Sequence, residues 1–522
     1  MSADVPDVVV VGGGIAGITA AIGAAKRGLR VTLLEGSPRL AGRARSHRDP
    51  ETGDAVPIGP HIFLDESFYG SVFQLLDALG TRQHVTFQKD PRHFITIVDG
   101  QKETDINYLP LPAPVSFSQG LLNMIRDFPE IEQADVQSSV AVTLFSWRCS
   151  DSELLELDGE SGISLLRRFN VTERFISRFY AFVSHAIFNV PIEEVSACAL
   201  LRFVRILTGR SVMQIGFPDT GLGELFTPAE RVLRELGADV RLRTEVASLE
   251  GTGTRCDGVV LETGEVLRPR VGVVLTLPAY QMSSLLHKEW LEASPALSAA
   301  AVQLKPCAYI AVYFWFDKKL TKKDFWARTF KEESLTCDWY DFSNIYAGWE
   351  DKPSFIGVNL IDTSARPVGK LSDEEIAQGC LEELCEYLPD ARNCKLLKTQ
   401  VQRVPCAIHR PVVGTEKLRI APGRCASVEG LFFAGDWTDT GLPYSMESAA
   451  SAGWAAAESL LKTAAEQGIE TAGSTGLRVP VPGIDMTPKI LSFLDVLRPF
   501  SVWLTKLRVG AERRQEMMRA RL

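Results

Sequence analysis

The stretch VVVVGGGIAGITAA, residues 8–21, passes from an apolar run through a glycine-rich turn into small and apolar residues. Four consecutive valines, 8–11, are typical of a buried strand in a parallel sheet covered on both faces. The turn has the pattern G-x-G-x-x-G at Gly12, Gly14 and Gly17. In this pattern the first glycine allows the tight turn, the second lets a pyrophosphate approach the backbone, and the third lets helix and strand pack closely. We therefore expect N–H groups at the start of the following helix to face a negatively charged ligand.

A second predicted strand, LRVTLLE, ends at Glu35. This residue follows Gly17 by 18 positions, where a carboxylate can accept hydrogen bonds from the ribose of a dinucleotide. An ordinary strand–helix turn is the alternative, but strand, helix, second strand and terminal acid occur here in the required order. The segment therefore predicts a dinucleotide site, although Glu35 alone does not separate FAD from NAD.

Size and composition restrict the possible partners. The 522 residues exceed the size at which one hydrophobic core keeps growing, so two or more lobes are expected. The net charge of −9 gives no support for a nucleic-acid partner. Ten cysteines without a C-x-x-C pair predict neither a metal site nor a disulfide framework, and fit a cytoplasmic location. We expect no signal peptide and no spanning helix, since no uncharged stretch reaches about 20 apolar residues.

Two further segments carry polar groups suited to such a ligand. The loop GSPRLAGRARS, residues 36–46, contains Arg43, whose guanidinium can donate two hydrogen bonds to phosphate oxygens. Near the other end of the chain, GLFFAGDWTDTGLPYSMESAASAGWAAAESLL, residues 430–461, reads as a buried strand, a loop and a helix of small residues. Its Asp436 is well placed to bind a ligand hydroxyl, but taken alone it could equally cap a helix.

Together these two ends resemble the FAD-dependent amine oxidase and carotenoid desaturase superfamily, in which both segments bind one FAD. The resemblance implies an α/β fold, with a Rossmann-type FAD-binding lobe and a discontinuous substrate lobe of mixed sheet and helices (an α+β cap). It also implies that Val246 contacts the adenine through its backbone and that Met446 lies at the flavin carbonyl. The residues implied to bind FAD are Gly12, Gly14, Ile15, Ala16, Gly17, Glu35, Gly42, Arg43, Val246, Gly435, Asp436 and Met446.

Two positions depart from the superfamily pattern. The family usually has two glycines before the arginine, whereas this chain has Ala41-Gly42-Arg43. The extra methyl group puts the approach of this loop to the flavin in question. Relatives also commonly carry glycine in the last helix where this chain has Ser448.

The substrate side resembles a narrower group. GDWTDTGLP is most similar to the squalene-associated FAD-dependent desaturases (hydroxysqualene dehydroxylases), and GPHIFL, residues 59–64, is similar to the G-x-H segment of those enzymes and of plant-type phytoene desaturases. The resemblance implies an apolar isoprenoid substrate, squalene-derived or a carotenoid precursor, and hydride transfer at flavin N5. His61 is the candidate catalytic residue because histidine titrates near neutral pH. A structural role for His61, orienting the loop through a backbone hydrogen bond, is the alternative.

Three rival functions remain open at this stage. A phytoene-type desaturase would run the hydride in the other direction. An amine oxidase would need an aromatic cage and a lysine near the flavin, but Tyr444 is displaced by one position from the usual aromatic residue. The only candidate lysine is Lys305, and its position favours a solvated residue at a strand edge. A scaffold without enzymatic activity is the third rival.

The segments divide the chain into lobes and a tail. We expect an FAD-binding lobe of residues 1–85, 221–280 and 425–463, a substrate lobe of residues 86–220 and 281–424, and a linker at 464–488. Residues 489–522 carry a net charge of +5 with interspersed apolar and aromatic residues, whereas the remainder carries −14. Such a basic amphipathic tail suits an anionic membrane surface, which would make the protein peripheral to a membrane, or the acidic body of the protein itself.

Overall fold

The computed structural model describes residues 5–107, 131–208, 214–329, 331, 333–360, 367–473 and 476–479. The predicted tail, 489–522, lies outside these residues, as does part of the predicted linker. Within the described ranges, no helix combines the length and the apolar character that crossing a membrane requires.

The N-terminal lobe is built on a six-stranded sheet with the strand order β10-β2-β1-β14-β21-β20. All pairings are parallel except that of β20 with β21. The strands are β1 (Val8–Val11), β2 (Val31–Glu35), β10 (Asp239–Leu242), β14 (Gly272–Leu275), β20 (Gly423–Arg424) and β21 (Leu431–Phe433). The predicted strand–turn–helix and the Rossmann-type lobe are thereby confirmed.

Alternate valines of β1 contact opposite layers of this lobe. Val8 and Val10 share a core with α1 (Ile15–Ala25), α2 (Glu66–Leu79), α10 (Ala229–Glu235) and α16 (Met446–Glu466). Val9 and Val11 share another core with α11 (Ala279–Met282), α12 (Lys288–Ala293), α13 (Pro295–Gln303) and the small sheet of β11 (Val246–Thr252), β12 (Arg255–Leu261) and β13 (Val266–Leu267). Because α12 and α13 cover this sheet, the lobe extends past the expected boundary at residue 280.

The second lobe has a seven-stranded mixed sheet with the order β19-β15-β18-β17-β16-β7-β8. The strands are β7 (His93–Asp99), β8 (Lys102–Asn107), β15 (Pro306–Phe316), β16 (Phe325–Arg328), β17 (Thr336–Asp341), β18 (Phe355–Leu360) and β19 (Leu396–His409). Only the pair β16–β7 is parallel among the described pairings of this sheet. The predicted discontinuous, mixed-sheet and helical substrate lobe is confirmed.

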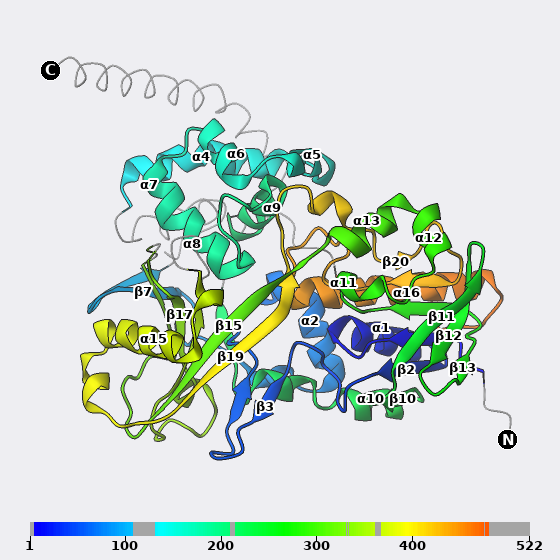
Figure 1. The fold of residues 1–522 in the computed structure, drawn as a ribbon, viewed down its shortest axis with the longest axis horizontal. Coiled ribbons are helices and arrows are strands. Elements are labelled where there is room, and N and C mark those ends of the chain that lie inside the picture. Colours follow the sequence, from blue (N-terminus) through cyan, green and yellow to red (C-terminus); the bar gives the residue numbers. More distant parts are fainter. Residues whose placement is uncertain are drawn as a thin grey trace.

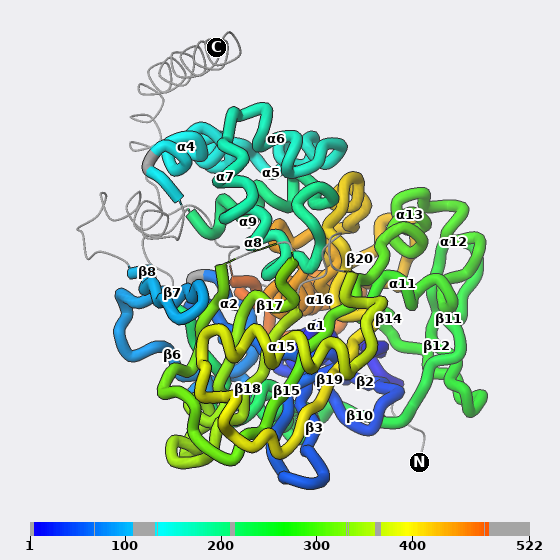
Figure 2. Tube along the Cα trace, turned by 60° about the vertical axis from the view of Figure 1, so that its left-hand side comes forward, coloured from blue at the N-terminus to red at the C-terminus, as the bar shows by residue number. Residues whose placement is uncertain are grey.

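Helices cover both faces of the seven-stranded sheet (Figures 1 and 2). One face packs against the helical cap, made of α4 (Gln133–Arg148), α5 (Asp151–Glu156), α6 (Gly162–Arg168), α7 (Glu173–Phe175), α8 (Ala181–Val183) and α9 (Ala197–Thr208), with π-helical turns at Ile176–Tyr180 and Ser184–Phe188. The other face packs against α15 (Asp373–Tyr387). A short helix, α14 (Phe342–Ile345), follows β17.

Short strands join the two lobes. They are β3 (Ser46–Arg48) with β4 (Ala55–Pro57), and β5 (Phe63–Leu64) with β9 (Ile215–Pro218) and β6 (Val85–Phe87). The hydroxyl of Tyr313 on β15 donates to the carbonyl of Pro57 (2.7 Å), and the hydroxyl of Tyr346 donates to the carbonyl of Ala55 (3.0 Å). These buried bonds hold the segment before Gly59 against the sheet of the substrate lobe.

The two ends of the sequence meet where α1 packs along α16. Helix α16 has glycine at position 453, and a Cβ atom built there would lie 2.6 Å from the carbonyl oxygen of Ala16 and 2.7 Å from Cβ of Thr19. On α1, a Cβ on Gly23 would lie 2.6 Å from Cβ of Ala457 on α16, and a Cβ on Gly17, in the first turn of α1, would lie 1.9 Å from the carbonyl oxygen of Gly12. Small residues in both helices are therefore a condition for the contact.

We expect Gly453→Ala to lower the free energy of unfolding by about 1–3 kcal/mol, because its Cβ would overlap backbone atoms that cannot rotate away. This cost outweighs the roughly 1 kcal/mol that alanine gains in helix propensity. Urea unfolding measures the change. Gly369→Ala is the control, since a Cβ there meets no atom within 4 Å; equal stability of the two variants would contradict the close packing of α1 and α16.

Candidate active site

The turn between β1 and α1 leaves one side open for a ligand. Gly12 has φ +105°, which L side chains rarely adopt, and Gly17 faces the backbone of the turn. At Gly14, by contrast, an added Cβ would meet nothing within 4 Å. Gly14 is also the N-cap of α1, which receives no side-chain hydrogen bond and has no acidic residue in its first turn. Free N–H groups facing open space fit the pyrophosphate of FAD.

Glu35 lies beside this turn. Its Oε2 accepts a hydrogen bond from the backbone N–H of Gly13 (2.7 Å), and its Oε1 accepts one from the N–H of Ser37 (2.8 Å). The carbonyl of Glu35 accepts from the N–H of Thr244 (2.9 Å), which brings the start of β11, and with it Val246, to the same end of the sheet. The carboxylate has lone pairs left for a ribose hydroxyl.

Arg43 and Asp436 bring the two sequence ends into direct contact. Nη2 of Arg43 donates to Oδ1 of Asp436 (2.9 Å), and Nη1 donates to the carbonyl oxygen of Ala407 on β19 (2.6 Å). Asp436 is 4% exposed. Burial by itself would raise the pKa of this carboxyl, but the charge and hydrogen bond of Arg43, together with the neighbouring His409, outweigh burial and hold it below its usual range. Asp436 is therefore charged at neutral pH, as the resemblance requires of a group that binds an FAD hydroxyl.

The loop before Arg43 has an unusual backbone. Ala41 has φ +85° and Gly42 has φ +54°. The N–H of Ala41 donates to the carbonyl of Gly13 (2.8 Å), and a Cβ on Gly42 would lie 3.1 Å from Cα of Gly14. The loop therefore keeps the close approach to the glycine turn, and the alanine found at position 41 adopts a conformation that glycine adopts without strain.

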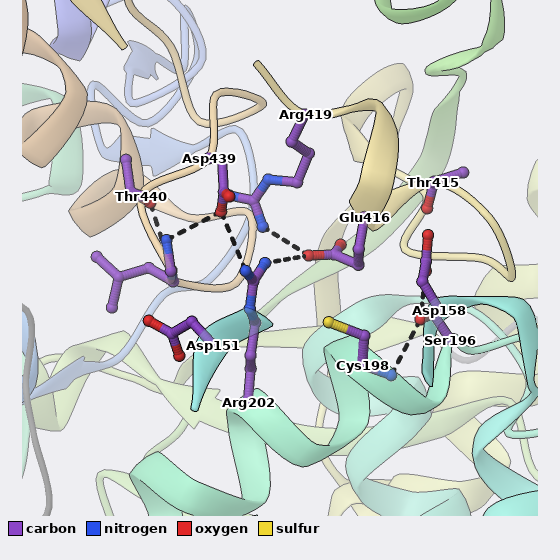
Figure 3. A network of polar contacts seen from close by, with 12 residues as sticks. Asp151, Asp158, Ser196, Cys198, Arg202, Thr415, Glu416, Arg419, Asp439 and Thr440 are labelled. Atoms are coloured by element: carbon purple, nitrogen blue, oxygen red, sulfur yellow. Dashed lines mark hydrogen bonds and ion pairs between the residues drawn. The ribbon is translucent and has the colours of Figure 1, made fainter. Parts of the chain in front are cut away.

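A buried network of charged side chains binds the loop after Asp436 (Figure 3). Arg419, which is fully buried on its side chain, donates from Nη2 to the carbonyls of Asp436 (3.3 Å) and Thr438 (2.8 Å) and from Nη1 to Glu416 (2.9 Å). The same oxygen of Glu416 accepts from Arg202 on α9 (2.8 Å), and Arg202 also pairs with Asp439 (3.1 Å). The network joins the substrate lobe to the Asp436 loop.

Sequence reasoning did not single out Arg202, Glu416 or Arg419. One signal was present for Arg202, because it interrupts the apolar helical run ALLRFVRIL. A charged residue on the buried face of a helix needs a partner of opposite charge.

His409, also not singled out, lies at the end of β19 beside Asp436 and is completely buried. Its Nε2 accepts a hydrogen bond from the N–H of Ala279 (3.3 Å), so a neutral ring carries its proton on Nδ1. Nδ1 lies 3.8 Å from Oδ1 of Asp436. His409 thus adds a second donor that faces the Asp436 carboxylate.

The residues at the start of α16 complete this side of the site. Met446 is the first residue of the helix, and Ser445 caps it by accepting from the N–H of Ser448 (3.2 Å). The hydroxyl of Ser448 donates to the carbonyl of Asp436 (3.0 Å) and lies 2.7 Å from the hydroxyl of Thr440. The serine found in place of glycine therefore supports the Asp436 loop.

Tyr444 precedes α16, so its displacement by one position does not turn its side chain around this helix. The ring is buried beneath the guanidinium of Arg419, whose Cζ lies 4.6 Å from the ring centroid, and beside His409. Lys305 is exposed just before β15, and its carbonyl accepts from the N–H of Arg410 (2.9 Å). Tyr444 thus packs against protein side chains, and the exposure of Lys305 agrees with a solvated residue at a strand edge.

His61 is half-buried among aromatic side chains. Its Nε2 lies 3.2 Å from the hydroxyl of Tyr69, and its ring makes edge contacts with Phe63 and Tyr69. The partner of the imidazole is a side chain, and not the backbone group expected for a purely loop-orienting role. Burial lowers the pKa of His61 to about 4, so the ring is neutral at neutral pH and is a weaker base than an exposed histidine. In the described part of the chain, no cluster of His, Cys, Asp and Glu could hold a metal ion.

These features define an α/β protein with a flavin-dinucleotide site assembled from both ends of its chain. The sequence pattern of the family described as "Flavin containing amine oxidoreductase" matches residues 15–461, and the chain belongs to this family. It is therefore an FAD-dependent oxidoreductase, and the open glycine turn, Glu35, Arg43 and Asp436 fit its cofactor.

Individual relatives include carotenoid desaturases. A 15-cis-phytoene desaturase from an Oncidium hybrid cultivar is 26% identical over 467 residues, which cover 87% of this chain and 78% of the relative. A zeta-carotene desaturase from Synechocystis sp. is 22% identical and covers 87% of this chain and 97% of its own. Putrescine oxidase bound to putrescine has a similar fold, with a TM-score of 0.64, 16% identity and coverage of 88% and 99%.

Ala41→Gly should raise the free energy of unfolding by about 0.5–1 kcal/mol, because glycine adopts φ +85° without the steric cost that alanine bears. Urea unfolding of the FAD-free protein measures the change. Ala44→Gly is the matched control: its φ is not positive, so we expect it to lower stability. A loss of stability in Ala41→Gly would show that the methyl group packs favourably.

Asp436→Asn should weaken FAD binding by about 30-fold or more, because it removes the charge that Arg43 and His409 face in a buried site. Titration calorimetry and the ratio of flavin to protein absorbance measure the loss. Asp390→Asn, an exposed carboxylate in the substrate lobe, should leave both unchanged. Undiminished affinity in Asp436→Asn would remove this residue from the FAD site.

His61 predicts a specific pH dependence of stability. Its folded-state pKa of about 4 lies below the ordinary value near 6.5, so the stability it contributes is full above about pH 6.5 and is lost as pH falls toward 4. Between pH 7.5 and 5.0 the wild-type protein should lose about 1–2 kcal/mol more than His61→Gln, as measured by urea unfolding. Tyr69→Phe keeps the imidazole and should behave as the wild type does; identical slopes in all three proteins would exclude the buried neutral ring.

Proposed function

We propose that this FAD-dependent oxidoreductase acts on an apolar isoprenoid, either squalene-derived or a carotenoid precursor. The observation that carries the proposal is the apolar character of the protein around the segment 59–64. His61 is flanked by Phe63 and Tyr69, and half-buried apolar side chains of this segment and of the helical cap pack against one core: Ile62, Leu64, Phe182, Ala186 and Ile187. The similarity to carotenoid desaturases over 87% of the chain supports the same substrate class.

Different residues bind the cofactor, handle a proton and orient the substrate in such a reaction. Bound FAD supplies hydride exchange at N5 of its flavin ring. The uncapped start of α1 and Arg43 bind the pyrophosphate, while Glu35 and Asp436 accept hydrogen bonds from cofactor hydroxyls. Burial keeps His61 neutral, so the ring can accept a proton from the substrate only transiently and must pass it on, because the charged imidazolium is disfavoured there. The aromatic and aliphatic side chains around it exclude water and orient the hydrocarbon.

The two directions of hydride transfer, desaturation and reductive removal of a substituent, use the same residues and differ in the substrate. An amine oxidase is the rival that specific observations disfavour. Tyr444 packs beneath Arg419, and Lys305 is exposed on the surface, so neither residue is arranged as a cage or a buried lysine.

The tail, residues 489–522, belongs to the same proposal. Its net charge of +5 and its tryptophan and phenylalanine side chains favour contact with an anionic membrane, where an isoprenoid would be dissolved. The protein would then be cytoplasmic and peripheral to the membrane. Deleting 489–522 should reduce sedimentation with phosphatidylserine-containing vesicles while leaving FAD content intact; unchanged sedimentation would reject the membrane role.

The substrate class is tested by following the flavin spectrum anaerobically. We expect squalene-type or carotenoid-type isoprenoids to reduce the oxidised flavin or to reoxidise the reduced flavin, with a converted product in the extract. Amines should leave the oxidised flavin unchanged, and Lys305→Met should match the wild type. Rapid flavin reduction by amines, with hydrogen peroxide formed in air and a loss in Lys305→Met, would instead establish the amine oxidase. Bound flavin that no isoprenoid reduces or reoxidises would favour the scaffold.

A further inference from the structure

Helix α2, which follows the loop of His61, is broken at Tyr69. Tyr69 has φ −97° and ψ 29°, outside the helical region, so the helix continues after it as a second segment. A helical segment that starts after such a break has N–H groups in its first turn that lack carbonyl partners. Ser71 and Val72 lie in this turn and are buried, so their N–H groups need acceptors from elsewhere in the protein.

Glu447 of α16 accepts from both of these N–H groups. Its Oε1 accepts a hydrogen bond from the N–H of Ser71 (2.8 Å), and its Oε2 accepts one from the N–H of Val72 (2.9 Å). The carboxylate therefore caps the second segment of α2 from another helix, at the end where the helix dipole favours a negative charge. The indole Nε1 of Trp454 on α16 also donates to the carbonyl of Ser71 (3.2 Å), which binds the same turn a second time.

The charge of Glu447 depends on this contact. The residue is 2% exposed, and burial raises its pKa to about 7, although the hydrogen bonds of Val72 and Ser71 oppose the rise. In the ranges that the structure describes, no lysine or arginine forms an ion pair with Glu447. A buried carboxylate without a cation needs hydrogen-bond donors. The ionised side chain therefore binds α2 at one defined position.

The broken turn places Tyr69 against His61. Tyr69 is buried, its hydroxyl lies 3.2 Å from Nε2 of His61, and the two rings meet edge to face with their centroids 6.0 Å apart. Tyr69 precedes Ser71 by two residues, so a movement of the turn that Glu447 binds would also move the ring that shields the imidazole. The surroundings of His61 therefore depend on Glu447.

Glu447 also directly follows Met446, the residue that the resemblance places at the flavin carbonyl. Successive residues of a helix point about 100° apart, so the first turn of α16 directs Met446 one way and Glu447 toward α2. One helical turn thus connects the cofactor side of the site with the pair of Tyr69 and His61.

We propose that Glu447 is a positioning residue, which binds the broken turn of α2, holds Tyr69 against His61 and fixes this pair relative to the cofactor. The inference rests on the proposed function, which gives His61 its part in handling a proton. Glu447 acts through the backbone of Ser71 and Val72 and not through contact with the substrate.

Hydrogen exchange of the FAD-loaded protein tests the contact with α2. At pH 8 a carboxyl with a pKa of about 7 is mostly ionised, and Glu447→Gln then keeps the volume of the side chain but leaves one of the two N–H groups without an acceptor. We expect exchange in peptides that cover residues 66–79 to become about tenfold faster or more, because a hydrogen bond to a charged group is lost. Exchange in α9 and β15 should stay unchanged.

Modification by diethyl pyrocarbonate, which reacts with neutral imidazole, tests the link to His61. Tyr69 shields the ring in the wild-type protein, so Glu447→Gln should raise the rate of modification at His61 by about threefold or more, as located by peptide mass spectrometry. Tyr69→Phe keeps the shielding ring and should react at the wild-type rate. A purely structural role of Glu447 would lower stability without a selective change at His61.

Glu383 on α15 offers a matched control. It is also buried, and its two carboxylate oxygens accept from the N–H groups of Leu335 (2.7 Å) and Thr336 (3.1 Å). Glu383→Gln should speed exchange near β17 and leave α2 and His61 unchanged. Glu447→Asp keeps the charge but withdraws it by one methylene, so it should show smaller changes in the same direction as Glu447→Gln. It provides the same test if Glu447→Gln loses FAD.

Two results would overturn the inference. Faster exchange in α2 without a change at His61 would show that Glu447 only stabilises the helix. Equal acceleration in all peptides would show a global loss of stability. Neither measurement needs a substrate, so the inference and the proposed function can fail separately. Selective changes at α2 and His61 support positioning even if no isoprenoid alters the flavin, in which case the proposed function alone fails.

Discussion

The contact between α1 and α16 is the constraint on which the rest of this structure depends. These helices come from opposite ends of the chain, and they pack closely because Gly453 presents no side chain to the backbone of Ala16. Their contact fixes the glycine turn at the start of α1 relative to the loop that contains Asp436. Only in that arrangement can Arg43 reach Asp436 at 2.9 Å. The close packing of the two helix backbones therefore determines where the charged groups of the cofactor site lie.

Several charged side chains are buried near this contact, and nearby groups compensate their charges. Arg419, Glu416 and Arg202 are almost fully inaccessible, and each has a partner of opposite charge or a backbone carbonyl. Removing one member of such a set is costly because it leaves the others unpaired.

The sequence predicted the site best where its residues lie close together along the chain. The strand 8–11, the glycine turn and Glu35 lie within one short segment, and Asp436 follows its strand directly, so spacing alone placed them. His409 could not be singled out, because its neighbours depend on the register between β15 and β19 and on a contact with Ala279, 130 positions away. The departure at Ala41 was visible in the sequence, but its positive φ was not. The sequence did not show that the FAD-binding lobe continues past residue 280, because the short helices α12 and α13 carry no signal for the sheet of β11, β12 and β13 against which they pack.

The distance along the chain between the two halves of the cofactor site bears on biosynthesis. The glycine turn ends at Gly17, whereas Asp436 is added more than 400 residues later. At about 5–20 residues per second, translation separates the two by roughly 20–80 s. During that interval the apolar residues of α1 that pack against α16 are exposed, and the cofactor site lacks Asp436 and its loop. Enclosure of the flavin is thus a late event in synthesis, and the apolar surface that stays exposed until then favours aggregation of the incomplete chain.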